Sequence, residues 1–180
     1  MPLDATPDSI TREEIHTRAV IVKSYRRSDG LFDVEGHLTD VRPYPVQLPS
    51  GMRQGGEPIH DMWLRLTVDV NAQIIAIKAS THGAPYGKSC ASITPAYEAL
   101  VGKRVGPGFR GAVRSLVGGL KGCTHLSELL LAMGTCVIQA LYDAKPHPPD
   151  VKPFSLDGCH ALNTSGPIVA EFYPRWYRRP

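Results

Sequence analysis

The chain has 180 residues, of which 42% are hydrophobic, which suits one well-buried domain and is short for two. A formal net charge of +3, from 20 basic and 17 acidic residues, is too small and too little patterned for a nucleic-acid-binding stripe. The four cysteines are widely spaced without a Cys-x-x-Cys pair, which argues against a zinc ribbon or a thioredoxin-like motif. Reduced thiols in a cytoplasm fit this pattern best.

The first residues, MPLDATPDSITREE, include acidic side chains and lack the apolar region of a signal peptide. No segment approaches the roughly 20 apolar residues that a membrane helix needs. We therefore expect a cytoplasmic protein with no nucleic-acid or membrane partner. We expect a single domain over residues 1–180, with a polar lead-in at 1–14 and an irregular C-terminal arm at 145–180.

Two hairpins are predicted in the first half of the chain. A β-branched run within residues 16–27 and the turn Ser28-Asp29-Gly30 predict a hairpin with residues 31–40. The proline- and glycine-rich stretch 43–58 has too many breakers for regular structure, and it is either a mobile cover over a site or a surface excursion. Residues 59–70 alternate between apolar and polar side chains and turn into residues 74–80, which predicts a second hairpin.

The second half of the chain is mostly helical by pattern. Thr94 as N-cap and Pro95 predict a short helix over 95–101, and apolar spacing predicts another over 109–117. Apolar residues at helical spacing predict a long amphipathic helix within 122–143, capped by Thr124. Residues 168–172 suit a short strand or an arm. These elements predict an α+β domain, in which an antiparallel sheet of two hairpins is covered on one face by the long helix and shorter ones.

The start of the long helix is the richest in chemistry. Cys123 lies just outside it and His125 in its first turn, where the helix dipole and the imidazole favour a thiolate that can act as ligand or nucleophile. His125 and Glu128 are three residues apart, which suits two ligands on one metal or a carboxylate that orients an imidazole. The alternative is a small buried cysteine, a histidine facing water and an ordinary exposed pair.

His60 has the parity of the apolar face of its strand, so it needs a hydrogen bond, a ligand role or an open pocket, the first being the usual case. His37, Asp40 and Arg42 form a polar group that either binds an anion or makes a structural salt bridge. Tyr97 joins these three as a candidate substrate-binding residue.

Other candidates lie in the loops. His82 and Cys90 flank a glycine-containing loop between a strand and a helix, where sites often form. Asp157, Cys159 and His160 lie within four residues, but neighbouring side chains of an extended chain point in opposite directions. We interpret that segment as a lid or a structural element.

Five segments carry a resemblance that spans nearly the whole chain: VEGHLTDVRPYP, GGEPIHDMWLRLTVD, GKRVGPGFR, GGLKGCTHLSELL and LDGCHAL. They resemble a bacterial family known only as domain of unknown function 2889. The resemblance brings no reaction with it. Its members tend to lie among genes for the breakdown of aromatic and other carbon compounds, which implies small-molecule catabolism by association.

A fainter resemblance covers residues 59–143. The order of hairpin, short helix and a long helix opening at GCTHLSELL is similar to the NifU/SufE-type scaffold fold, in particular to the NifU N-terminal iron–sulfur scaffolds. In that family three cysteines hold the metal or cluster. The matching positions are His60, then His82 or Cys90, then Cys123 or His125. Imidazoles in place of thiolates suit Zn²⁺ or another divalent ion better than an iron–sulfur cluster, and the same residues also suit a metal-free acid–base pocket.

No dinucleotide fingerprint, P-loop or nucleophile elbow occurs, which disfavours nicotinamide, ATP and serine-hydrolase chemistry. We therefore expect an enzyme of aromatic or carbon-compound catabolism, a lyase of decarboxylase or deformylase type. Its catalytic residues would be His60 and His125 as acid and base, Glu128 as orienting group and Cys123 as ligand or polarising group, with Arg42 as an anion clamp. The cofactor is either none or a divalent metal such as Zn²⁺.

Two other classes stay open: a metal-binding scaffold without catalysis and a binding module. From the aromatic residues Trp176 and Tyr177 in the C-terminal arm we expect a homodimer. All site hypotheses require convergence, because His60 must lie within ~10 Å of Cys123 or His125 for proton transfer or shared ligation.

Overall fold

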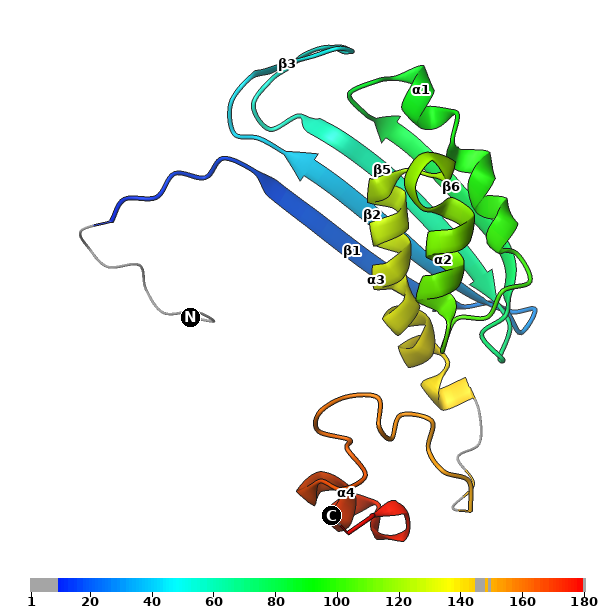
Figure 1. Ribbon diagram of the computed structural model, residues 1–180. Helices are drawn as coiled ribbons and strands as arrows, with labels where there is room; N and C mark the ends of the chain where they lie inside the picture. The colour runs from blue at the N-terminus through cyan, green and yellow to red at the C-terminus, as the bar shows by residue number, and fades with distance from the viewer. Residues whose placement is uncertain (1–9, 145–147, 149, 180) are drawn as a thin grey trace. The chain divides into compact units, whose positions relative to one another are not determined.

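The four long strands form one antiparallel sheet with the order β1-β2-β5-β6 (Figure 1). Each strand pairs with its neighbour in the sheet, so the sheet consists of the two predicted hairpins joined side by side. The strands are β1 (Thr17–Arg26), β2 (Phe32–Val41), β5 (Pro58–Val68) and β6 (Ile74–Gly83).

The computed structural model describes residues 10–144, 148 and 150–179. Residues 1–9 of the expected lead-in lie outside this part. The chain divides into two units, 1–144 and 145–180, and the sheet belongs to the first.

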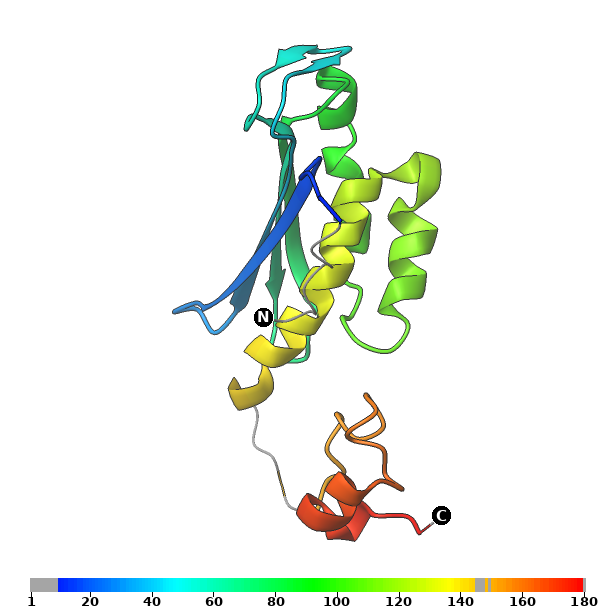
Figure 2. The ribbon, with the colours of Figure 1, turned by 90° about the vertical axis from the view of Figure 1, so that its left-hand side faces the viewer.

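The helices of the first unit cover one face of the sheet, as the turned view shows (Figure 2). The predicted α+β architecture, an antiparallel sheet covered on one face by a long helix and shorter ones, is thereby confirmed. In chain order the helical segments are α1 (Lys88–Ala91), η1 (Thr94–Leu100), α2 (Phe109–Val117), η2 (Gly119–Lys121), α3 (Thr124–Ala140) and η3 (Tyr142–Ala144).

Three local predictions are corrected. Within 43–58, the residues Val46–Leu48 (β3) and Gly51–Arg53 (β4) pair as a small second hairpin, because the prolines lie outside the paired residues. Thr94 is the first residue of η1 and not its cap. Thr124 is likewise the first residue of α3, and Cys123, in an extended conformation, is the N-cap.

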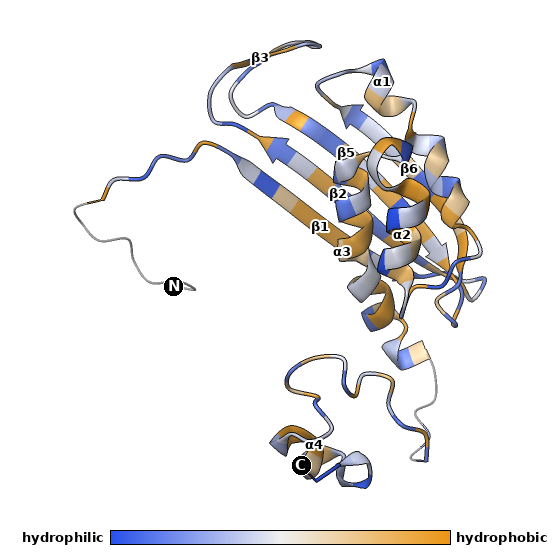
Figure 3. Ribbon diagram, viewed as in Figure 1, coloured by the Kyte–Doolittle hydropathy of each residue, from blue (hydrophilic) through white to orange (hydrophobic). Residues whose placement is uncertain are grey.

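The core lies between the sheet and α3. Along β2 every second residue, from Phe32 to Asp40, is buried, as alternation in a one-sided sheet requires. Figure 3 shows the apolar residues concentrated in the strands and in the helices above them. By length and composition Thr124–Ala144 is apolar enough to cross a membrane, but α3 buries six residues in this core, as a core helix does: Leu126, Leu129, Leu130, Met133, Gly134 and Val137.

Gly36 allows α3 to approach the sheet closely. A Cβ atom at Gly36 would lie 2.6 Å from Sδ of Met133 and 2.9 Å from Cδ1 of Leu129, closer than van der Waals contact permits. The absent side chain therefore sets the distance between α3 and β2, and with it the height of the first turn of α3 above the sheet.

The second unit contains α4 (Pro167–Phe172) and η4 (Pro174–Trp176). Of the two alternatives for residues 168–172, a short strand or an arm, the strand is wrong, because Pro167 occupies the first turn of a helix, where its missing N–H is no loss. Trp176 and Tyr177 are half-buried, so the exposed aromatic tail that suggested a homodimer is not exposed. The homodimer stays a prediction.

Candidate active site

Three side chains form a row across the covered face of the sheet. Asp40 of β2 is the register partner of Arg18 on β1 and of His60 on β5. Since directly opposite residues of an antiparallel sheet point to the same face, the three side chains meet beneath the helices. The predicted placement of His60 on the apolar face is thereby confirmed.

Irregular pairing accompanies this row. The register between β2 and β5 shifts after the pair Asp40 and His60, with Val41 opposite Pro58. Such bulges reorient side chains at the ends of strands. A second shift lies between β5 and β6, where pairing passes from Thr81 to Gly83 and leaves His82 between them.

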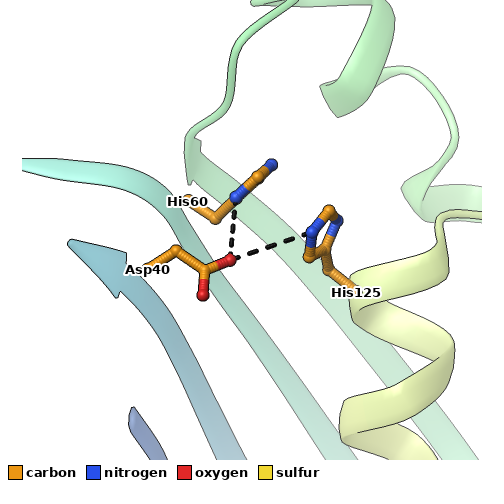
Figure 4. Close-up of side chains that lie close together, drawn as sticks. All are labelled: Asp40, His60 and His125. Atoms are coloured by element: carbon orange, nitrogen blue, oxygen red, sulfur yellow. Dashed lines mark ion pairs between the residues drawn. The ribbon is translucent and has the colours of Figure 1, made fainter. Parts of the chain in front are cut away.

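His125 completes the group from above. It lies in the first turn of α3, and its ring stacks on that of His60, with centroids 3.8 Å apart and planes 29° apart. Nε2 of His125 lies 3.8 Å from Oδ2 of Asp40, and Nδ1 of His60 lies 2.9 Å from the same oxygen (Figure 4). The convergence that the site hypotheses require is therefore present.

Asp40 is the centre of the charge network. Its side chain is only 4% exposed, and Arg18 donates to both oxygens, from Nε at 2.7 Å and Nη2 at 2.8 Å. Nε2 of His16 lies 3.0 Å from Oδ1. Burial alone would raise the pKa of Asp40, but Arg18, with smaller contributions from His60 and His16, lowers it to about 2. Asp40 is thus an anion at every physiological pH.

Both stacked histidines are held in the neutral form. Burial lowers the pKa of His60, and His125 lowers it further against the opposing effect of Asp40. Burial also lowers the pKa of His125, helped by Arg18 and opposed by Asp40 and Glu128. Neutral imidazoles can accept a proton or ligate a metal.

The contact between His60 and Asp40 is short but poorly aligned. Nδ1 of His60 is buried and makes no hydrogen bond of good angle, although it lies 2.9 Å from the carboxylate. The carboxylate therefore acts on Nδ1 mainly through its charge.

Cys123 lies on the other side of His125. Its Sγ is 3.8 Å from Nδ1 of His125 and 4.0 Å from Sδ of Met62. Tyr97 fixes the backbone of Cys123, because its hydroxyl accepts from the N–H at 3.1 Å and donates to the C=O at 2.8 Å. Gly122 contributes too, since a Cβ there would lie 2.1 Å from the carbonyl oxygen of Val117.

Two predicted roles are corrected. Glu128 does not orient His125, because its carboxylate accepts from Nη1 of Arg18 at 2.8 Å, and the carboxylate beside Nε2 of His125 is that of Asp40. Arg42 is not the arginine of this group. Its guanidinium lies over the ring of Tyr44, two residues beyond Asp40 and outside the row.

His37 and Asp40 do not act together, because they are an odd number of residues apart on one strand and face opposite sides. On the uncovered face, His37 stacks on Trp63 with centroids 3.9 Å apart, and both lie within hydrogen-bond distance of Asp61, at 2.8 Å and 3.2 Å. This outer group is a separate structural cluster.

Tyr97, predicted to bind substrate, is fully buried, so it positions Cys123 and offers no surface to a ligand. His82 is exposed. Neither His82 nor Cys90 belongs to the group of potential metal ligands found among the described residues, which is Asp40, His60 and His125.

The segment of Asp157, Cys159 and His160, predicted to be a lid or a structural element, lies in the second unit. Asp157, with a left-handed backbone at φ 65°, accepts hydrogen bonds from the N–H and hydroxyl of Thr164 at 2.9 Å and 2.8 Å. Cys159 and His160 are exposed. The structural interpretation of this segment therefore has direct support in the bonds of Asp157.

Arg18 and His16 are members of the site that sequence reasoning missed. The available signal was the register of the first hairpin: with a turn at 28–30, Arg18 falls opposite Asp40. A separate hollow of about 290 Å³ between α2 and α3, with Phe109 and Ile138 in its wall, shares no residue with the site.

The protein comparisons give a family and no activity. No curated protein matches the chain, and no solved structure matches it, so nothing supports the resemblance to the NifU/SufE-type scaffolds. A family model described as "protein of unknown function (DUF2889)" matches residues 16–139. That match includes the row of Arg18, Asp40 and His60, together with His125 and Cys123. The chain therefore belongs to the DUF2889 family.

Proposed function

We propose that this protein is a small-molecule enzyme, a lyase that removes a carboxyl or one-carbon unit from an aromatic or carboxylated compound. The observation that carries the proposal is the stacked pair of His60 and His125, held against the buried anion of Asp40. Paired imidazoles with lowered pKa values beside a fixed carboxylate are typical of acid–base sites. The aromatic class of substrate comes from the association of the family with carbon-compound breakdown.

His60 is the group that meets the substrate. Its Nδ1 lies beside the carboxylate of Asp40, which stabilises a proton on that nitrogen and leaves Nε2 as the base. In a decarboxylation the C–C electron pair remains on the substrate carbon as CO₂ leaves. His60, after taking a proton from solvent, delivers that proton to the carbon. His125 and Arg18 adjust the charge balance around Asp40.

To test the proposal, the protein is incubated with a panel of hydroxylated aryl carboxylic acids and aryl aldehydes, and the release of CO₂ and formate is measured. We expect turnover by the natural chain and a loss of at least ~100-fold in kcat for His60→Gln, the usual size of an acid–base contribution. His82→Gln, a change at an exposed histidine outside the cluster, is the matched control. Full turnover by a folded His60→Gln/His125→Gln variant would exclude the proposal.

A second candidate function is divalent metal binding, favoured by one observation. One ligand atom from each of Asp40, His60 and His125 lies within 4.8 Å of the others, a spread that modest movement brings to tetrahedral coordination with one open position. This group contains nitrogen and oxygen ligands and no thiolate, which suits Zn²⁺ and not an iron–sulfur cluster.

Metal content separates the two candidates. Near-stoichiometric zinc in the purified chain, lost in Asp40→Asn and in His125→Gln but retained in Cys90→Ser, would establish the metal candidate. Titration of the chelator-treated protein with Zn²⁺ gives a second readout through protection from thermal unfolding. Absence of any such protection would leave the metal-free acid–base site.

A further inference from the structure

Cys123, which the acid–base proposal does not use, forms a series of contacts with His125 and Asp40. His125 separates the other two: its Nδ1 lies 3.8 Å from Sγ of Cys123, and its Nε2 lies 3.8 Å from Oδ2 of Asp40. Nucleophile, base and orienting carboxylate thus stand in the order that cysteine-based acyl transfer needs. Both distances are loose, as they often are without substrate.

The position of Cys123 suits a nucleophile. It is the N-cap of α3, a helix of 17 residues with no side-chain cap, so the N–H groups of the first turn are free of a capping side chain. Such amides stabilise a developing negative charge on sulfur or on a bound oxyanion. The side chain is partly exposed, which leaves it accessible to a small electrophile.

The surroundings hold Cys123 in place. The hydroxyl of Tyr97 hydrogen-bonds to both the N–H and the C=O of Cys123. Burial raises the pKa of Tyr97, so this hydroxyl stays protonated and can donate. Asp40 is itself fixed by Arg18. Cys123 and Asp40 are therefore each positioned by a side chain outside the three residues, as preorganised catalysis requires.

We propose that Cys123 is a covalent nucleophile, activated by His125 and Asp40, that takes the acyl group of an activated ester or thioester. His125 accepts the thiol proton, and the sulfur forms a bond to the carbonyl carbon. The leaving group departs with the proton from His125. Water, deprotonated by the same imidazole, then cleaves the thioester, releasing a carboxylic acid and restoring the thiol.

This activity is independent of the lyase proposal, although it shares His125 and Asp40 with it. It needs no carboxyl release, and the lyase reaction needs no acyl–cysteine. The two proposals therefore fail separately. An acylated Cys123 without CO₂ or formate release supports this inference alone, and carboxyl release by a Cys123→Ser variant supports the lyase alone.

The experiment uses p-nitrophenyl acetate as the probe on the full chain. We expect a burst of nitrophenol and one acetyl group on Cys123, located by peptide mass spectrometry after acid quenching. Cys123→Ser removes the burst, and His125→Asn slows acylation by at least ~100-fold, the usual contribution of a positioned base. Cys90→Ser and Cys136→Ser are matched controls at partly buried cysteines outside the series of contacts.

A pH profile separates activation from a structural effect. Alkylation of Cys123 by iodoacetamide is followed from pH 5 to 9, with exposed Cys159 as the internal reference. In His125→Asn the profile of Cys123 moves to higher pH and that of Cys159 stays in place. Equal acylation of Cys123 and Cys159 in the natural chain, or an unchanged profile in folded His125→Asn, would overturn the inference.

Discussion

Arg18 and Asp40 are register partners on neighbouring strands, and the guanidinium of Arg18 donates to both carboxylate oxygens of Asp40. The third nitrogen of the same guanidinium donates to Glu128 on α3. One side chain therefore ties the edge strand of the sheet to the helix that carries His125 and Cys123.

Asp40→Asn leaves a guanidinium and three histidines without their common anion. We expect a loss of about 2 kcal/mol in the free energy of unfolding, because the charge-assisted hydrogen bonds at this buried position are lost, while Arg18 itself is 35% exposed and keeps Glu128. Urea unfolding followed by circular dichroism measures it. Glu35→Gln, which breaks a pair with Arg65 on the uncovered face, should cost less than about 1 kcal/mol.

Arg18→Lys keeps the charge and loses the two-oxygen geometry. An ammonium cannot hold both oxygens of Asp40 and reach Glu128, so we expect a loss of about 1–2 kcal/mol in the free energy of unfolding. Arg65→Lys is the control, because Arg65 pairs with Glu35 at the exposed surface. Equal losses in the two variants would show that the geometry at Asp40 contributes nothing special.

Acidification should destabilise the fold in two stages. The pKa values of His60 and His125 are lowered from 6.5 in the folded chain, so the unfolded state binds protons more readily and stability falls as the pH drops below 6.5. The pKa of Asp40 is lowered from 3.8 to about 2 in the folded chain. Protonation of this carboxylate therefore lowers the stability further as the pH falls below 3.8. Urea midpoints from pH 8 to about 2 test this, and a His60→Gln/His125→Gln variant should lose most of the first stage.

Gly36→Ala should weaken the packing of α3 on the sheet. The added methyl group would overlap the ends of Met133 and Leu129, and overpacking of this kind costs about 1–3 kcal/mol. Gly111→Ala in α2 is the control, since a Cβ there meets nothing within 4 Å and alanine in an exposed helix stabilises by about 0.5–1 kcal/mol. Thermal unfolding of the two variants should therefore shift in opposite directions.

Tyr97→Phe removes the hydroxyl that bonds to the backbone of Cys123. We expect a loss of about 1–2 kcal/mol, because the N–H of Cys123 loses its partner while partly buried. Hydrogen exchange at the first turn of α3 should accelerate in this variant more than exchange in α2. Unchanged protection there would contradict the role that we assign to Tyr97.

Periodicity was enough to predict the two hairpins, the long helix and the inward orientation of His60, because each depends on local spacing. The residues that contact Asp40 could not be predicted from periodicity, because they come from other parts of the sequence. Arg18 and His60 reach it through strand register, and His125 through the docking of α3 on Gly36. The prediction for Arg42 failed because β2 ends at Val41, just after a register shift that follows Asp40, so strand alternation no longer places Arg42 on the face of Asp40.

The bridge formed by Arg18 gives the first turn of α3 a tether to an outer strand of the sheet. A ligand that displaced Glu128 from that guanidinium would loosen the tether without touching either histidine. Ligand binding at Glu128 and the reactivity of the Cys123 thiol would then be coupled through one cation, the guanidinium of Arg18.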